Sequence, residues 1–326
     1  PELLAAAVLG LGSCGGASAS SSATPADAAP TEGAVEGATR TVDTAFGPVE
    51  IPADPQRVVA LEGGVGPLLD AGITPVGTAD GDQDYVFLPE EYEQVKDLPI
   101  VLGPDGLLLE EIAELEPDLL IGFVRGGKEE ELSAEKQAEF EKLSAIAPTV
   151  LVRATGSATV KDSALQMSEA LGDGEEAQAE KQRYLDRAAQ IKTEYADVLS
   201  TNVIAAVDSS PEEAYVYSPI SWMGGILTDI GATLPAVAAT ETEENAAFLS
   251  FEQLGRLDEA TIVLHEQNAD GTPGPGAADL AAQPTYAQLT AVREGRDYGV
   301  TQFFADRYKT ALVVLDQLEA VLAEQR

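Results

Sequence analysis

Leu108–Phe123 reads LLEEIAELEPDLLIGF, and the same pattern returns in Leu249–Leu264, which reads LSFEQLGRLDEATIVL. In each stretch a Glu opens a short helix, an acidic turn follows, and an apolar run predicts a buried strand. A strand of this kind needs a sheet and covering helices around it. We therefore predict an α/β protein with two similar Rossmann-like lobes and a ligand cleft between them.

Short apolar runs on both sides of the repeated pattern predict further strands, at Arg57–Leu61, Thr149–Val152 and Val203–Val207. Predicted helices separate these strands, which is the order of a parallel sheet. Between the two halves, Glu175–Leu199 contains neither Gly nor Pro, and its apolar residues recur at three- and four-residue steps. We predict one long helix there, which joins the lobes as a rigid connector.

The first forty residues differ in composition from the rest of the chain. Residues 3–11 read LLAAAVLGL, an apolar run too short to span a bilayer and typical of the core of a secretory signal. In residues 15–40, Gly, Ala, Ser, Thr and Pro fill 21 of the 26 positions, which predicts a flexible tether. We divide the chain into a signal remnant (1–14), a tether (15–40), an N-terminal lobe (41–158), a connecting helical segment (159–200) and a C-terminal lobe (201–326).

The charged and reactive residues exclude several classes of function. The 326 residues include 19 Lys and Arg against 56 Asp and Glu, and the net charge of −37 argues against nucleic-acid binding. One Cys and one His allow neither an intrachain disulfide nor a thiolate or multi-His metal site. Without a G-x-S-x-G elbow, an extracellular α/β enzyme is only the less favoured alternative. We expect no catalytic residue, no resident cofactor and no protein-borne metal.

Seven stretches carry a family resemblance through their order and spacing: Ile51–Leu61, Ala71–Gly77, Leu109–Ile121, Leu143–Val150, Ile226–Gly231, Ser250–Leu257 and Pro284–Val292. Together they resemble the periplasmic-type substrate-binding proteins of ABC importers, in the class that carries ferric siderophores, haem and cobalamin. The resemblance covers about residues 41–326 and implies two lobes bridged by one long helix. It also implies a monomer that delivers a ferric siderophore to a permease dimer, with haem or cobalamin as the alternative ligand.

The resemblance assigns roles to two acidic residues. In this family one Glu on each lobe docks into basic pockets of the permease subunits, and Glu110 and Glu252 hold the matching positions. Two charges fixed on a rigid frame would set the orientation and the rate of association. The alternative is that each is an ordinary first-turn acid facing the helix dipole.

The segment Leu11-Gly12-Ser13-Cys14 resembles a bacterial lipobox, in which the Cys is lipidated and becomes the new N-terminus. A lipidated Cys14 would anchor the folded domain to the cell membrane outside the cytoplasm. The other interpretation of Cys14 is a small residue in a flexible leader. Residues 1–40 hold four acidic residues and one basic residue, so nearly all of the negative charge belongs to residues 41–326.

Ligands of two-lobed α/β proteins bind beyond the carboxyl ends of the strands, so the loops there supply candidate ligand-binding residues. Arg125 and Arg153 each follow a strand and offer planar donors to carboxylate, catecholate or hydroxamate oxygens. Aromatic residues of the same loops offer rigid contact area to a bulky chelate: Tyr85, Phe123, Tyr217, Trp222 and Phe303. The alternatives are local ion pairs for the arginines and core packing for single aromatics such as Trp222 and Phe304.

Three further features bear on the ligand. His265 and Met223 would make a His/Met haem pair, although a lone His is more often a structural residue. Gly63-Gly64-Val65-Gly66 lacks the G-x-G-x-x-G spacing of a dinucleotide loop, so we predict a backbone turn at the cleft. The negative domain disfavours polyanions at long range, although salt screens this beyond about 8–10 Å. We therefore favour a hydroxamate or another neutral or cationic ferric complex.

Overall fold

Four parallel strands form the sheet of the first lobe, in the order β4-β3-β7-β8. The computed structural model describes residues 37–79, 86–103, 106–126 and 132–326. Side chains alternate between the two faces of a strand, so Val58 packs into one core and Val59 into the core on the opposite face. The strands are β3 (Val58–Ala60), β4 (Gly77–Thr78), β7 (Leu119–Arg125) and β8 (Thr149–Ala154).

Helices cover both faces of this sheet. On one face α1, α2 and α5 contribute apolar side chains to the core, and on the other face α3 and α4 do so through Ile112 and Leu143. The helices are α1 (Val65–Asp70), α2 (Pro89–Val95), α3 (Leu109–Glu114), α4 (Ala134–Ser144) and α5 (Val160–Leu171). Two hairpins flank the sheet, formed by β1 (Thr39–Thr44) with β2 (Gly47–Pro52) and by β5 (Leu102–Gly103) with β6 (Gly106–Leu107).

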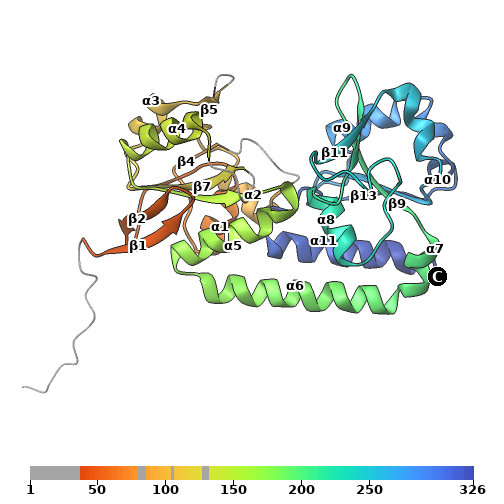
Figure 1. Ribbon diagram of the computed structural model, residues 1–326, viewed down its shortest axis with the longest axis horizontal. Helices are drawn as coiled ribbons and strands as arrows, with labels where there is room; N and C mark the ends of the chain where they lie inside the picture. The colour runs from red at the N-terminus through yellow and green to blue at the C-terminus, as the bar shows by residue number, and fades with distance from the viewer. Residues whose placement is uncertain (1–36, 80–85, 104–105, 127–131) are drawn as a thin grey trace, which may run out of the picture. The chain divides into compact units, whose positions relative to one another are not determined.

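The second lobe has a five-stranded sheet in the order β11-β10-β9-β12-β13. The strands β9, β12 and β13 are parallel, whereas β10 runs antiparallel to both of its neighbours. The strands are β9 (Ile204–Ser209), β10 (Ala214–Tyr217), β11 (Ala246–Leu249), β12 (Ile262–Glu266) and β13 (Asp297–Val300). The chain therefore forms the two α/β lobes that the repeated sequence pattern predicts (Figure 1).

Short helices surround the second sheet. They are α8 (Trp222–Asp229), the 3₁₀ helix η2 (Phe251–Leu257), α9 (Pro275–Ala281), the 3₁₀ helix η3 (Tyr286–Gln288) and α10 (Thr290–Arg293). Another 3₁₀ turn, η1 (Ser157–Thr159), leads from the first sheet into α5. Side chains of β9 alternate between two cores, because Ala206 packs on the side of α8 and Ala205 packs on the side of η2.

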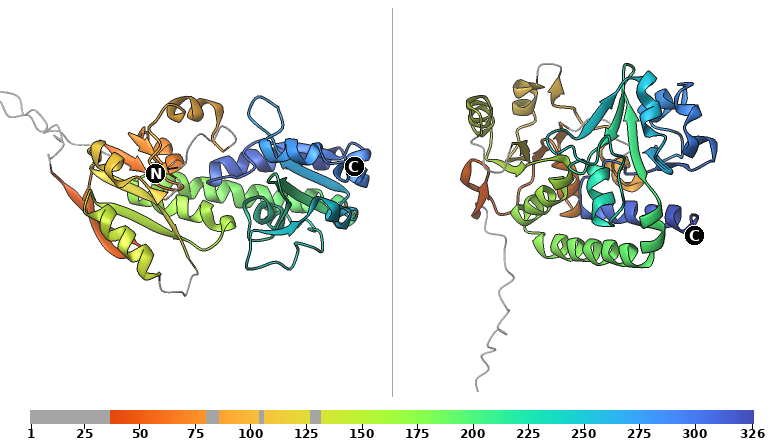
Figure 2. Two further views of the ribbon diagram at one scale, coloured as in Figure 1. Left: turned by 90° about the horizontal axis from the view of Figure 1, so that it is seen from above. Right: turned by 45° about the vertical axis from the view of Figure 1, so that its right-hand side comes forward.

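The long helix α6 (Gly174–Glu194) runs beside the last helix, α11 (Tyr308–Ala323), in both views (Figures 1 and 2). Its 21 residues give a length of about 31 Å. Arg187 of α6 pairs with Asp316 at 3.0 Å and with Glu319 of α11. The predicted single helix over Glu175–Leu199 ends early, because Tyr195 leaves helical geometry and separates α6 from α7 (Ala196–Thr201).

Candidate ligand-binding site

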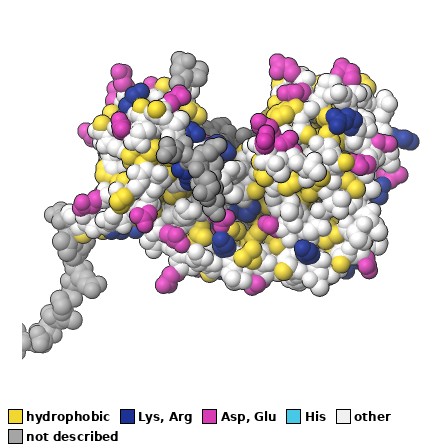
Figure 3. Space-filling view, viewed as in Figure 1, with side chains coloured by type: hydrophobic (Ala, Val, Ile, Leu, Met, Phe, Trp, Pro, Cys, Tyr) yellow, Lys and Arg dark blue, Asp and Glu magenta, His cyan; other side chains and the backbone are white. Residues whose placement is uncertain are grey.

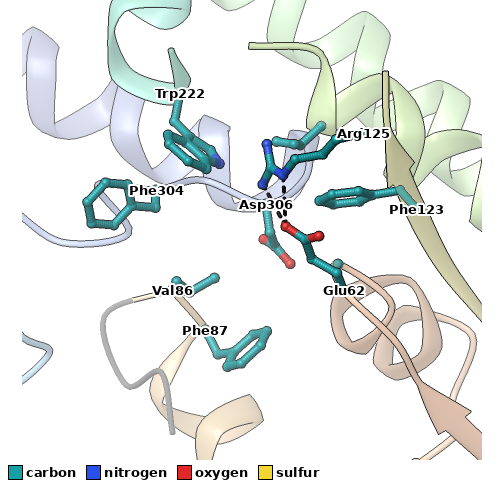
Figure 4. Close-up of a pocket in the computed structure, with 10 residues that line it drawn as sticks. Glu62, Val86, Phe87, Phe123, Arg125, Trp222, Phe304 and Asp306 are labelled. Atoms are coloured by element: carbon teal, nitrogen blue, oxygen red, sulfur yellow. Dashed lines mark hydrogen bonds and ion pairs between the residues drawn. The ribbon is translucent and has the colours of Figure 1, made fainter. Parts of the chain in front are cut away.

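A cavity of about 290 Å³ lies where residues of the two lobes meet (Figure 4). The first lobe contributes side chains at the carboxyl ends of β3 and β7, and the second contributes the start of α8 and the segment before α11. Ten of the described residues line it: Glu62, Gly63, Val86, Phe87, Phe123, Arg125, Val160, Trp222, Phe304 and Asp306. We refer to it as the Arg125 cavity. Its position beyond the strand ends is where α/β proteins bind ligands.

Arg125, the last residue of β7, extends its guanidinium between two aromatic rings of the cavity wall (Figure 4). Its Nε and Nη2 donate to Glu62 Oε1 at 3.0 and 2.7 Å, and its Nη1 donates to Ser157 Oγ at 3.4 Å. The guanidinium carbon lies 5.1 Å from the ring centroid of Phe123 and 5.8 Å from that of Trp222. Both separations are within the range of cation–π attraction.

The ion pair between Arg125 and Glu62 is exposed to solvent. The side chain of Arg125 is 41% exposed and that of Glu62 is 50% exposed. An exposed pair of this kind contributes about 0–1 kcal/mol, because water competes for both charges. Arg125 can therefore exchange Glu62 for the oxygens of a ligand at little energetic cost.

Gly63 allows the ring of Phe123 to reach the cavity. Its φ is +73°, and a Cβ at this position would lie 2.2 Å from Cε1 of Phe123. A left-handed backbone favours glycine, and the contact leaves no room for a side chain. The turn predicted at Gly63-Gly64-Val65-Gly66 is confirmed at Gly63, which brings the loop after β3 against the end of β7.

Aromatic residues of the second lobe lead from its core to the cavity. Trp222 and Phe304 line the cavity and meet edge to face, with ring centroids 5.3 Å apart. Phe303 is 1% exposed and packs behind Phe304, and Tyr217 is 6% exposed and packs behind both. The Tyr217 hydroxyl donates to Asp208 Oδ2 at 3.3 Å. Of the aromatic candidates in this lobe, the structure brings Trp222 to the cavity and places Phe303 and Tyr217 in the core.

Asp306 reaches the cavity from the segment before α11. Arg307 Nη1 donates to both of its carboxylate oxygens at 2.9 Å, and the Thr310 hydroxyl donates to Oδ1 at 2.7 Å. Burial raises the pKa of Asp306, and this exceeds the opposing effect of Arg307. The charges of Glu91 and Asp70 raise the pKa of Asp306 further.

Arg307 joins the two lobes behind this cavity. Its Nε donates to Asp70 Oδ2 at 2.6 Å, and its Nη2 donates to Glu91 Oε1 at 2.5 Å. Lys309 Nζ donates to the same two acids, at 2.9 and 2.7 Å. Burial raises the pKa of Glu91, but the charges and hydrogen bonds of Arg307 and Lys309 outweigh it, and the net pKa is lowered. We refer to Asp70, Glu91, Asp306, Arg307 and Lys309 as the Arg307 cluster.

The remaining predicted ligand-binding residues lie elsewhere. Arg153 is partly buried beside Gly126, with Nη1 3.5 Å from the position of a Cβ on that glycine, and it does not belong to the described lining of the Arg125 cavity. Tyr85 lies outside the described residues. Glu62 and Asp306 also line the cavity but were not predicted from the sequence, because no local pattern marks an acidic residue as facing a cavity.

The predicted haem pair does not meet at the described cavity. His265 Nδ1 lies 3.1 Å from the Glu266 carbonyl oxygen, and His265 Nε2 lies 3.6 Å from Asp297 Oδ1. Met223 is fully buried in the core beneath α8. Neither side chain lines the described part of the Arg125 cavity.

The two candidate docking residues are both exposed first-turn acids. Glu110 lies in the first turn of α3, and Glu252 lies in the first turn of η2. Hydrogen bonds from its own backbone N–H and from the Ser250 side chain lower the pKa of Glu252. In Figure 3 acidic side chains lie along the upper edge of both halves and also on their sides and lower edges, so their distribution does not single out one edge.

Two α/β lobes, one long helix beside them and a cavity lined from both lobes define a two-lobed ligand-binding protein. The chain belongs to the periplasmic-binding-protein family, whose model matches residues 58–302. This family consists of substrate-binding proteins of ABC transporters rather than enzymes. The match confirms the predicted family and fold class and the prediction that the protein is not an enzyme. In the described part of the chain, no helix is both long and apolar enough to cross a bilayer.

Named relatives bind iron chelates. The chain is 29% identical over 296 residues to "Probable siderophore-binding lipoprotein YfiY" of Bacillus subtilis, covering 86% of this chain and 87% of the relative. It is 28% identical over 258 residues to the Fe(3+) dicitrate-binding periplasmic protein FecB of Escherichia coli, covering 78% and 79%. The solved structure of the siderophore periplasmic binding protein from the fuscachelin gene cluster of Thermobifida fusca is 36% identical. It has a TM-score of 0.75, covering 84% of this chain and 98% of that one.

Proposed function

We propose that this protein captures a ferric siderophore outside the cytoplasm and delivers it to the permease of an ABC importer. The observation that carries the proposal is Arg125, held between Phe123 and Trp222 in a cavity lined by both lobes. A guanidinium offers planar donors to chelate oxygens, and the rings offer rigid apolar contact to the chelator. The siderophore-binding relatives support the same ligand class.

The charges of the cavity favour a chelate without net negative charge. Arg125 faces Glu62 at 2.7 Å, and Asp306 adds a second acid to the wall. Among the described lining residues there is therefore no excess of positive charge with which to offset a polyanion. Since the chelator supplies every ligand to the iron, the cavity has to recognise only the outer surface of the complex. This favours a neutral or cationic ferric complex, such as a hydroxamate.

Binding is testable through Trp222, because it is the only Trp of the chain and lines the cavity. We expect ferric hydroxamate complexes to quench its fluorescence at micromolar or lower concentration. Calorimetry of the same titration excludes optical artefacts, and the iron-free chelators are the control. If neither method detects binding of ferric hydroxamate, catecholate or carboxylate complexes, the proposal is wrong.

Delivery to a permease is proposed to depend on Glu110 and Glu252. Two exposed acids, one on each lobe, would fix the orientation of docking to basic pockets. The double variant Glu110→Ala/Glu252→Ala is expected to bind ligand normally and to lose uptake in cells that carry the cognate permease. Glu111→Ala/Glu243→Ala removes two other exposed acids and serves as the matched control. Equal uptake by the two double variants would exclude this docking role.

Anchoring is proposed to occur through lipidation of Cys14, which lies outside the described residues. More than one acyl chain makes such an anchor stable. We expect the protein to be found in the membrane fraction and to incorporate labelled fatty acid. Cys14→Ser is expected to release it into the soluble fraction with unchanged ligand affinity. Membrane retention of that variant would show that Cys14 is not the anchor.

A further inference from the structure

A second cavity, of about 450 Å³, lies within the first lobe and shares a wall with the Arg125 cavity. Glu62, Phe123 and Arg125 line both cavities. Phe123 N–H donates to the Glu62 carbonyl oxygen at 2.9 Å, so the edge of the sheet separates the two cavities, which lie against its opposite faces. Beyond this edge, the side chains of Arg125 and Glu62 form the partition between them.

The walls of the second cavity are mainly aliphatic. It lies beyond the ends of β3 and β4 and beside β7, between the β5–β6 hairpin and α4, and its aliphatic lining includes Leu61, Leu107, Val124, Leu143 and Leu151. Leu102 of β5 also lines it and is 49% exposed. We refer to this space as the aliphatic cavity. A large apolar concavity with a few polar groups is the usual form of a small-molecule site.

The polar groups of the aliphatic cavity are gathered mainly near the partition. Lys136 of α4 donates a hydrogen bond from Nζ to the backbone carbonyl of Arg125, which places this ammonium beside the Arg125–Glu62 pair. Glu139 lines the same cavity from the exposed side of α4. The two cavities together therefore run from a charged and aromatic end to an aliphatic end.

The partition can open at little cost. The ion pair of Arg125 with Glu62 is about half exposed, so water already competes for both charges. If ligand oxygens take the place of Glu62 at the guanidinium, Glu62 is released toward solvent. An arm of the ligand can then pass over the end of β7, beside the Arg125 side chain and the displaced carboxylate.

We propose that the aliphatic cavity binds an acyl or alkyl arm of the same ligand whose iron-binding head occupies the Arg125 cavity. The inference rests on the proposed function and adds the ligand class: an amphiphilic ferric chelate. Because the same three residues line both cavities, an arm of that ligand accounts for the arrangement better than a separate second ligand does. Burial of each methylene contributes about 0.8 kcal/mol, which corresponds to about a fourfold gain in affinity.

The test is a chain-length series on one iron-binding head. The probes are ferric desferrioxamine B complexes whose terminal amine carries an acetyl, butanoyl, hexanoyl or octanoyl group, titrated by calorimetry. For the wild type we expect affinity to rise about fourfold per methylene over the first few carbons. Leu102→Asp places a charge in the aliphatic cavity, and Val124→Phe fills part of it. Both variants are expected to flatten the rise in affinity with chain length and to leave the affinity for the acetyl complex unchanged.

Ile100→Asp is the matched control, because Ile100 is 48% exposed and does not belong to the described lining of the aliphatic cavity. It is expected to keep the wild-type dependence on chain length. If affinity does not depend on chain length, or if all four proteins show the same dependence, the proposed binding of the arm in the aliphatic cavity is wrong, and the proposed function is unaffected. Absence of binding by every complex, the acetyl complex included, overturns both this inference and the proposed hydroxamate ligand.

Discussion

Arg125 and Arg307 both meet carboxylates at the junction of the lobes, but in opposite surroundings. Arg307 is 4% exposed and contacts three carboxylates, Asp70, Glu91 and Asp306. Arg125 is 41% exposed and pairs with Glu62. A buried charge is tolerated only when partners compensate it fully, whereas an exposed pair is weak and exchangeable. The buried Arg307 therefore stabilises the fold, whereas the exposed Arg125 is available to a ligand.

The difference also explains how the cavity keeps its shape. Arg307 and Lys309, at the start of α11, bind the same two acids of the first lobe, Asp70 and Glu91. Asp306 is held by the same guanidinium and forms part of the cavity wall. The buried ionic cluster behind the cavity thus fixes Asp306 in the wall, while Arg125 can change its partner.

The largest expected effect is on folding, at Arg307. Arg307→Met removes the cation and leaves Asp70, Glu91 and Asp306 with Lys309 as the remaining cation of the Arg307 cluster. Breaking a buried ion pair in this way costs about 3–5 kcal/mol of unfolding free energy. Urea denaturation at pH 7 measures the loss. Arg125→Met is the matched control and is expected to lose about 1 kcal/mol or less. Equal losses in the two variants would remove the distinction between the arginines.

The next effect concerns Glu91 and depends on pH. Its folded-state pKa is lowered, so its contribution to stability is fully present above the unfolded value of about 4.3 and is lost as pH falls through the folded pKa. Glu91→Gln is expected to lose about 1.5–3 kcal/mol at pH 7, the range for a hydrogen bond to a charged group. The difference in unfolding free energy between this variant and the wild type is expected to narrow below about pH 4.3.

Glu93→Gln, on the same helix, provides the control for this pH series. The Glu93 side chain is 66% exposed and forms an ion pair with Lys96 at 2.7 Å. Its replacement is expected to change stability by less than about 0.5 kcal/mol at any pH. A gap for Glu91→Gln that stays the same from pH 7 to pH 3 would show that hydrogen-bond geometry, and not charge, is what Glu91 contributes.

A smaller effect is expected for ligand binding at Arg125. Arg125→Gln is expected to weaken binding of a ferric hydroxamate about tenfold, or about 1.4 kcal/mol, with little change in unfolding free energy. Arg183→Gln is a matched control, since Arg183 is 52% exposed and pairs with Glu176 at 2.8 Å on α6, outside the lining of the cavity. Calorimetric titration of both variants decides the point. Unchanged affinity in Arg125→Gln would show that this guanidinium does not contact the ligand.

Local sequence patterns predicted the elements whose signals are local. The helix α5 (Val160–Leu171) lies within the predicted helical segment 159–200, and Gly172 ends it with a φ of +94°. The predicted helix Glu175–Leu199 is helical on both sides of Tyr195, but it is not continuous, and no residue type marks the break at Tyr195. Tyr195 is 4% exposed and has the Arg326 guanidinium 4.1 Å from its ring centroid, a contact between distant residues that no local pattern contains.

The site was predictable where a residue follows a strand, and unpredictable where partners are distant. Arg125 was selected because it ends an apolar run. The Arg307 cluster joins residues separated by 237 and 216 positions, and no sequence signal links them. Phe303 and Phe304 are neighbours, and only the fold decides which of them faces the cavity. Gln302, with a φ of +51° and an amide that donates to the Phe87 carbonyl at 3.2 Å, sets the chain direction just before them.

The smallest expected effect, and the one with the opposite sign, is at Glu180 of α6, beside the Arg307 cluster. Burial raises the pKa of Glu180 and Asp70 raises it further, although Arg307 and Lys309 oppose both. Folding therefore disfavours its ionised form, and Glu180→Gln is expected to gain about 1 kcal/mol or less at pH 7. The gain should vanish below about pH 4.3, where the wild-type carboxyl is neutral in both states. Urea denaturation at pH 7 and pH 4 measures it. A gain equal at both pH values would assign the effect to packing. A loss at pH 7 would mean that the nearby cations, Arg183 at 3.7 Å together with Arg307 and Lys309, stabilise the Glu180 carboxylate.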